Sequence, residues 1–132
     1  MDSKIKILLV EDNLEDAAVT QRVLKHNKLN MGLVIAASGK EALAALQNKN
    51  KADLPQLILL DINLPDISGI DLLTCIKKDK NLNNIPVVIL TGSNEDQDIQ
   101  KSYDLGAGSY LVKPISNDAL MLVIEKLFYP RG

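Results

Sequence analysis

The chain has 132 residues, a formal net charge of -2 and 46% hydrophobic residues, few of them aromatic. This length predicts one domain over residues 1–132, with a core at about 4–129. Charges of both signs are mixed along the chain without a basic stripe, which argues against direct binding of nucleic acid. A single Cys and a single His exclude an internal disulfide and a zinc-type cluster, and favour a cytoplasmic protein. Because no apolar run is long enough to span a bilayer, we expect no membrane insertion.

Alternating strands and helices are expected along the whole chain. Short aliphatic runs between polar residues predict buried strands of a parallel sheet. Apolar residues at helical spacing predict the helices, with Asn13, Ser38 and Ser116 at capping positions and Glu15 and Asp16 in the first turn of the first helix. In chain order we predict a strand at 5–10, a helix ending near 27, a strand at 32–37, a helix at 38–46, a strand at 57–60, a helix at about 70–76, a strand at 86–90, a helix at 94–105, a strand at 109–112 and a helix at 117–128.

This alternation predicts an α/β fold of the (βα)5 type. Right-handed crossovers with helices on both faces give a doubly wound, parallel, five-stranded sheet, most simply in the flavodoxin-like order 2-1-3-4-5. The switch point of that sheet lies between the first and third strands. Ligands of such sheets bind beyond the carboxyl ends of the strands, so polar residues at those ends are the candidates for function.

Polar side chains follow four of the five predicted strands. They are Glu11 and Asp12 after the first strand, Asp61 after the third, Thr91 after the fourth and Lys113 after the fifth. Taken singly, each has a more ordinary role, because strand-end Asp and Thr often cap the next helix and a Lys is usually solvated. Together, three acids, a hydroxyl and an ammonium at one sheet edge can serve a single reaction.

Phosphoryl transfer is the chemistry that this set of groups favours. Three neighbouring carboxylates repel one another unless a cation lies among them, and oxygen ligands of this kind suit Mg²⁺. A carboxylate such as Asp61 can accept a phosphoryl group and become an aspartyl phosphate. Lys113 can then balance the added negative charge, and Thr91 offers a hydroxyl to a phosphoryl oxygen.

The residues around these positions resemble the receiver domain of two-component response regulators. The matching segments are 8–13 (Leu-Leu-Val-Glu-Asp-Asn), 60–65 (Leu-Asp-Ile-Asn-Leu-Pro), Gly69, Thr91 and 106–114 (Gly-Ala-Gly-Ser-Tyr-Leu-Val-Lys-Pro). The steps of 30 residues from Asp61 to Thr91 and of 22 residues from Thr91 to Lys113 match as well. The resemblance implies a single-domain, chemotaxis-regulator-like signalling protein, which is not an enzyme except that it assists its own phosphotransfer and dephosphorylation.

The resemblance also implies roles for individual residues. Asp61 would be the phosphoacceptor, supplied by a phosphohistidine on a sensor histidine kinase or a phosphotransfer protein. Asp12 and Asp61 would ligate Mg²⁺ directly and Glu11 through water. The backbone carbonyl of Asn63 would be a further ligand.

A conformational switch is a second implication of the resemblance. Thr91 would move toward the phosphoryl group and Tyr110 would turn inward, which remodels the surface of the fourth helix, fifth strand and fifth helix for a downstream protein or a second copy of the chain. The helix at 94–105 has few apolar residues, which suits an element that shifts. A cis bond between Lys113 and Pro114, usual in the family, would aim the ammonium into the site.

Two features depart from the family pattern. Gly92 follows Thr91 where Ala, Ser or Thr is common, and the smaller cover over the acyl phosphate, together with the polar Asn63, predicts a short-lived phosphorylated state. Segment 120–124 is apolar all round. Either a partner or a dimer mate covers its outer side, or neighbouring helices bury it more than usual.

Two other classes of function stay open at this stage. One is a receiver-like binding module that acts without phosphorylation, against which the intact acids, Thr91 and Lys113 argue. The other is a flavodoxin-like cofactor binder. Glu11 and Asp12 argue against that class, because they would repel an FMN phosphate where its phosphate-binding loop is expected.

Overall fold

The computed structural model describes residues 5–29, 32–47, 50–92 and 96–128. Five parallel strands form one sheet in the order β2-β1-β3-β4-β5, which confirms the predicted doubly wound topology. None of the described helices is long and apolar enough to cross a membrane. The elements are β1 (Lys6–Val10), α1 (Leu14–His26), β2 (Gly32–Ala36), α2 (Gly39–Leu46), the 3₁₀ helix η1 (Lys51–Asp53), β3 (Leu57–Asp61), α3 (Gly69–Lys78), β4 (Val87–Thr91), α4 (Asp96–Asp104), β5 (Ser109–Val112) and α5 (Asn117–Phe128).

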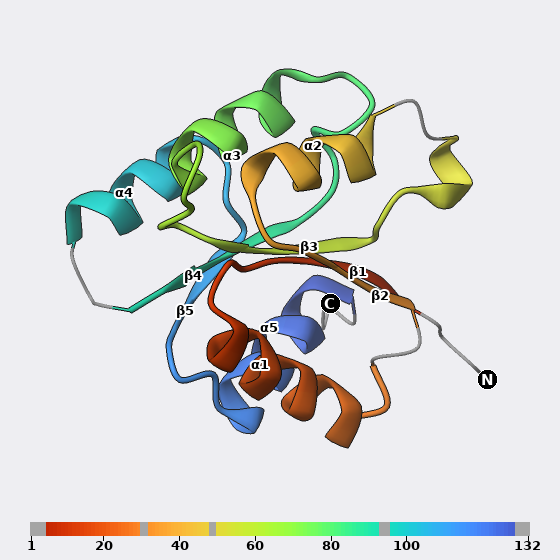
Figure 1. The fold of residues 1–132 in the computed structure, drawn as a ribbon, viewed down its shortest axis with the longest axis vertical. Coiled ribbons are helices and arrows are strands. Elements are labelled where there is room, and N and C mark those ends of the chain that lie inside the picture. The colour runs from red at the N-terminus through yellow and green to blue at the C-terminus, as the bar shows by residue number, and fades with distance from the viewer. Residues whose placement is uncertain (1–4, 30–31, 48–49, 93–95, 129–132) are drawn as a thin grey trace.

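Helices cover both faces of the sheet (Figure 1). α1 and α5 lie on one face, and α2, α3 and α4 lie on the other. The strands pair in register near their carboxyl ends, where Val10 lies opposite both Ala36 and Leu60, and Thr91 lies opposite Val112. The residues that follow the strands therefore gather along one edge of the sheet, as the sequence predicts.

The core consists of two layers, one on each face of the sheet. Every residue of β3 and β4 is buried, because these strands lie between both helical layers. Side chains of β3 alternate in direction, so Ile58 and Leu60 pack with α2 and α3 while Leu57 and Leu59 pack with α1 and α5. Each such side chain contributes about 1.5–3 kcal/mol by burial. The aliphatic run before Asp61 thus places that acid at the end of a fully buried strand.

The element boundaries follow the predicted signals closely. Asn13, Ser38 and Ser116 each accept a hydrogen bond from the amide three residues later, which confirms them as helix caps. α3 extends to Lys78, beyond the predicted end near residue 76, because lysines in a last turn interact favourably with the helix dipole. The predicted start of the fourth helix at Asn94 lies outside the described residues.

Segment 120–124 of α5 is buried mainly within its own molecule. Leu120, Val123 and Ile124 are buried, and Met121 is half-buried against the same core. Leu122 instead exposes 53% of its surface. Neighbouring elements therefore account for most of the apolar character of α5, and Leu122 is the member of this segment that is left accessible to a partner.

Candidate functional site

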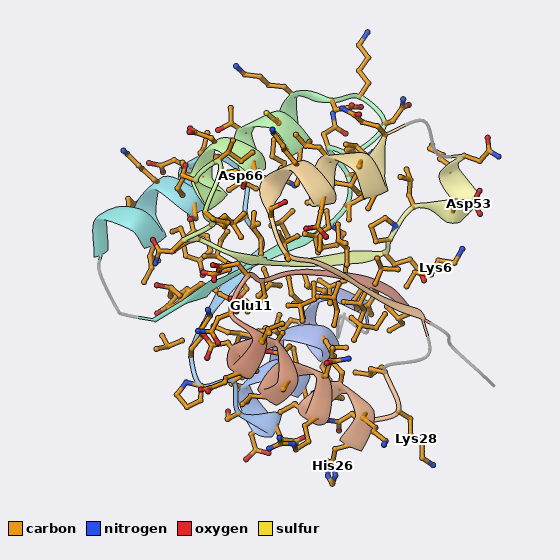
Figure 2. The ribbon with its side chains drawn as sticks, in the orientation of Figure 1. Lys6, Glu11, His26, Lys28, Asp53 and Asp66 are labelled. Atoms are coloured by element: carbon orange, nitrogen blue, oxygen red, sulfur yellow. The ribbon has the colours of Figure 1, made fainter. Side chains whose placement is uncertain are left out.

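Three acidic side chains lie together at the carboxyl edge of the sheet, as predicted. Glu11 and Asp12 follow β1, and Asp61 is the last residue of β3. One carboxylate oxygen from each lies within 4.8 Å of the other two, an arrangement that could hold a metal ion. Glu11 and Asp61 are buried, whereas Asp12 is exposed, so the cluster opens to solvent on the side of Asp12. Figure 2 shows Glu11 at the opposite edge of the sheet from Lys6, which begins β1.

The ammonium group of Lys113 reaches these acids from the end of β5. Its Nζ lies 2.7 Å from Glu11 Oε1, 3.0 Å from Asp61 Oδ2 and 3.0 Å from Asp16 Oδ2. The contacts with Asp61 and Asp16 are directed hydrogen bonds, and the contact with Glu11 is a close ion pair. The peptide bond between Lys113 and Pro114 is cis, in agreement with the expectation from the family.

The charges in the site act on one another's ionisation. Burial raises the pKa of the Glu11 carboxyl to about 7, and the nearby Asp61 raises it too, while Lys113 acts in the opposite direction. Burial lowers the pKa of Lys113, but its carboxylate partners outweigh this effect and hold the pKa above its ordinary value. One permanent positive charge therefore faces several acids, and a second cation among them would relieve their repulsion.

The carboxylate oxygens of the site also fit a metal. Asp61 Oδ1 accepts a 3.0 Å hydrogen bond from the amide of Asn63, which orients the carboxylate. Glu11 Oε1 is buried and pairs with the Lys113 ammonium at 2.7 Å, but it accepts no further hydrogen bond from the described residues, so it can also serve as a ligand. An open hollow beside the acids is lined by Asp12 and residues 62–68, which include Asn63. An oxygen-only donor set of this kind suits a hard divalent cation.

The two predicted switch residues lie on the neighbouring strands. Thr91 is buried at the end of β4, and its carbonyl accepts a 2.7 Å hydrogen bond from the amide of Lys113. Tyr110, on β5, is half-buried, and its ring meets the ring of Tyr103 on α4 edge to face, with centroids 6.1 Å apart. This aromatic pair joins β5 to α4. The movement of Thr91 and Tyr110 on phosphorylation stays a prediction.

One residue at the site was not predicted from the sequence. Asp16 lies in the first turn of α1, where acids are favoured by the helix dipole, and this was its only expected role. The structure instead brings its carboxylate to Lys113. The sequence signal that could have predicted this role is the position of Asp16 in the chain. A helix that starts directly after β1 keeps its first turn near the end of that strand, and therefore near the site.

Comparison with models of protein families identifies the family to which the chain belongs. The model of the response regulator receiver domain matches residues 7–125. Among similar sequences, the response regulator Rcp1 of Synechocystis sp. is 42% identical over 110 residues, which cover 81% of this chain and 75% of Rcp1.

Solved structures give the same result. The bacteriophytochrome response regulator AtBRR superposes with a TM-score of 0.82 at 36% identity, over 96% of this chain and 94% of AtBRR. The Mn(2+)-bound form of Rcp1 superposes with a TM-score of 0.75 at 37% identity, over 96% of this chain and 94% of that chain. This chain therefore belongs to the receiver domains of response regulators, which are signalling phosphoacceptors.

Proposed function

We propose that Asp61 is the phosphoacceptor of a two-component system or phosphorelay, and that it receives its phosphoryl group from a phosphohistidine on a sensor kinase or phosphotransfer protein. The observation that carries this proposal is the convergence of Asp61 with two further acids and the ammonium of Lys113. AtBRR is named for a bacteriophytochrome, so a phytochrome-linked kinase is the first class of donor to test.

The side chains have distinct parts in the transfer. An oxygen of Asp61 attacks phosphorus while the bond from phosphorus to the donor nitrogen breaks, and the imidazole keeps the electron pair. Both oxygens of Asp61 accept 3.0 Å hydrogen bonds, Oδ1 from the Asn63 amide and Oδ2 from Lys113, and Oδ2 suits the attack because Lys113 can pass its hydrogen bond to the incoming phosphoryl group. Lys113 then donates to a phosphoryl oxygen, and the Thr91 hydroxyl donates to another.

Mg²⁺ is the metal that this site would take. Glu11, Asp12 and Asp61 would hold it, with the backbone carbonyl of Asn63 as a further ligand. When bound, Mg²⁺ supplies positive charge to the phosphoryl oxygens. The same groups assist hydrolysis of the acyl phosphate, so the chain limits the lifetime of its own signal.

Output would pass through the surface of α4, β5 and α5. Three exposed apolar side chains on these elements support this assignment, namely Tyr103, Val112 and Leu122. Movement of Thr91 and Tyr110 would reshape this surface through the contact between Tyr110 and Tyr103. A downstream protein, or a second copy of the chain, would bind there.

The decisive test is labelling by a small phosphodonor such as acetyl phosphate. Label that requires Mg²⁺ and is lost in Asp61→Asn supports the proposal, because the amide cannot form the acyl phosphate. Thr74→Ala serves as a control, since Thr74 is a hydroxyl residue on α3 whose side chain bonds to the Ile70 carbonyl. Failure of the parent protein to accept label would favour a receiver-like binding module that acts without phosphorylation.

A further inference from the structure

Lys113 has three carboxylate neighbours, and they are not equivalent. Glu11 and Asp61 belong to the group of acids whose oxygens could hold a metal. Asp16 lies outside that group, yet its Oδ2 is as close to the ammonium as that of Asp61, at 3.0 Å. Asp16 is therefore the carboxylate partner of Lys113 that does not also belong to the possible metal ligands.

The exposure of these groups shows how they surround the ammonium. The side chain of Glu11 is fully buried and that of Asp61 is 5% exposed, whereas that of Asp16 is 41% exposed. The ammonium, itself 15% exposed as a side chain, lies between two inner acids and one outer acid. Asp16 holds Lys113 from the solvent side.

The first turn of α1 fixes the position of Asp16. Its backbone amide donates a 2.9 Å hydrogen bond to the side chain of the cap residue Asn13. The amide of Asn13 lies 3.3 Å from Glu11 Oε2, to which it donates. Asp16 is thus tied, through the cap of its own helix, to one of the acids of the site.

From this geometry we propose that Asp16 is a positioning residue that keeps the ammonium of Lys113 at the site when a divalent cation occupies the acids. A divalent cation held among Glu11, Asp12 and Asp61 would compete with Lys113 for their oxygens and would repel its ammonium. Asp16 keeps its charge free for Lys113 and counters that repulsion. The consequence for phosphoryl transfer rests on the proposed function, whereas the placement of Lys113 does not.

The direct test measures the order of the ammonium by ¹⁵N relaxation of Lys113 Nζ, with and without Mg²⁺. In the parent, the ammonium stays ordered under both conditions. In Asp16→Asn it is ordered without Mg²⁺, through its inner partners, and loses that order when Mg²⁺ is added. The matched control is Glu15→Gln, which removes an equal charge from the same helical turn at an exposed side chain and behaves as the parent does. An ammonium in Asp16→Asn that stays as ordered as in the parent with Mg²⁺ present overturns the proposal.

Phosphorylation rates supply a second, separate readout. Asp16→Asn slows labelling of Asp61 by about threefold to fivefold, the size expected for a partly exposed charge pair, and Glu15→Gln does not. In a Lys113→Ala background, Asp16→Asn has no further effect, because Asp16 acts through the ammonium. Equal slowing in both backgrounds overturns the proposal. A parent protein that takes no label refutes the phosphoacceptor function instead, and the relaxation measurement then still decides the role of Asp16.

Discussion

The loop that follows β3 and the helix that follows β4, α4, are held by different kinds of contact. The loop after β3, residues 62–68, is fixed at both ends. The amide of Gly69 donates a 2.8 Å hydrogen bond to the carbonyl of Ile62. In the middle of the loop, the carboxylate of Asp66 accepts hydrogen bonds of 2.8 and 2.9 Å from the amides of Gly39 and Lys40, which begin α2.

After β4, most of the described side chains, at 99–104 of α4, are exposed. Gly92 is exposed, and a Cβ built there meets no described atom within 4 Å. Within 99–104 of α4, only Ser102 is buried, while Ile99 is half-buried. The apolar contact that stands out is the edge-to-face pair of Tyr103 with Tyr110.

This difference matches a division of labour between chemistry and signal. The loop after β3 carries Asn63 and borders Asp61, and a phosphoacceptor must keep its geometry through repeated cycles. The segment after β4 adjoins Thr91, and an element that reports a chemical change has to move at small cost. Under the proposed function, the fixed loop would serve the reaction and the mostly exposed helix α4 would serve the readout.

A pair of glycine substitutions, Gly69 at the end of the loop after β3 and Gly92 directly after β4, has the largest expected effect. A Cβ at Gly69 would lie 2.5 Å from the Asp61 carbonyl oxygen and 2.6 Å from Ile62 Cα, which are backbone atoms that cannot move aside. Gly69→Ala should cost about 3 kcal/mol of unfolding free energy and displace Asp61. Gly92→Ala, at an open position, should change the unfolding free energy by less than about 1 kcal/mol. Urea denaturation of both variants measures the unfolding free energy. A similar loss of unfolding free energy in the two variants would contradict the difference between these positions.

Gly92 also permits a test of how solvent access beside Thr91 affects the site. Gly92→Val adds apolar cover beside Thr91 and should exclude water from the acyl phosphate. We expect decay of the phosphorylated protein to slow by about threefold to tenfold, equivalent to roughly 1 kcal/mol of activation barrier. Loss of label is followed after removal of the phosphodonor, with Gly92→Ala as the intermediate case. Decay that is unchanged or faster in Gly92→Val would show that cover at this position does not set the lifetime.

Much of the fold was predictable because its signals are local. Each strand is a short aliphatic run between polar residues, and the crossover rule then fixes the order of the sheet. The burial of segment 120–124 was not predictable, since it depends on how α5 packs with α1 and the sheet. Sequence left two explanations open there, and tertiary packing accounts for most of the segment.

The site shows the same limit more sharply. Glu11, Asp61 and Lys113 were found because parallel strands bring their carboxyl ends to one edge, so position in the sheet is enough. The contact of Asp16 with Lys113 joins residues 97 apart in the chain, and that of Asp66 with Gly39 joins residues 27 apart. Such contacts depend on loop conformation and side-chain direction, which hydrophobic periodicity does not report.

Loss of the hydrogen bonds between Asp66 and the start of α2 should have the smallest effect on stability. It tests whether the charge of Asp66 holds the loop after β3. The amides of Gly39 and Lys40 lower the pKa of the Asp66 carboxyl, so ionised Asp66 stabilises the folded state. This stabilisation is present above the unfolded-state pKa of about 4 and is lost as the pH falls through the lower folded-state value. Asp66→Asn should therefore lower the Tm by a few degrees at pH 7, and the difference from the parent should shrink below about pH 4. Asp53→Asn, an exposed change far from this loop in Figure 2, is the control for charge. A Tm difference that persists unchanged in acid would mean that Asp66 holds the loop by shape and not by its charge.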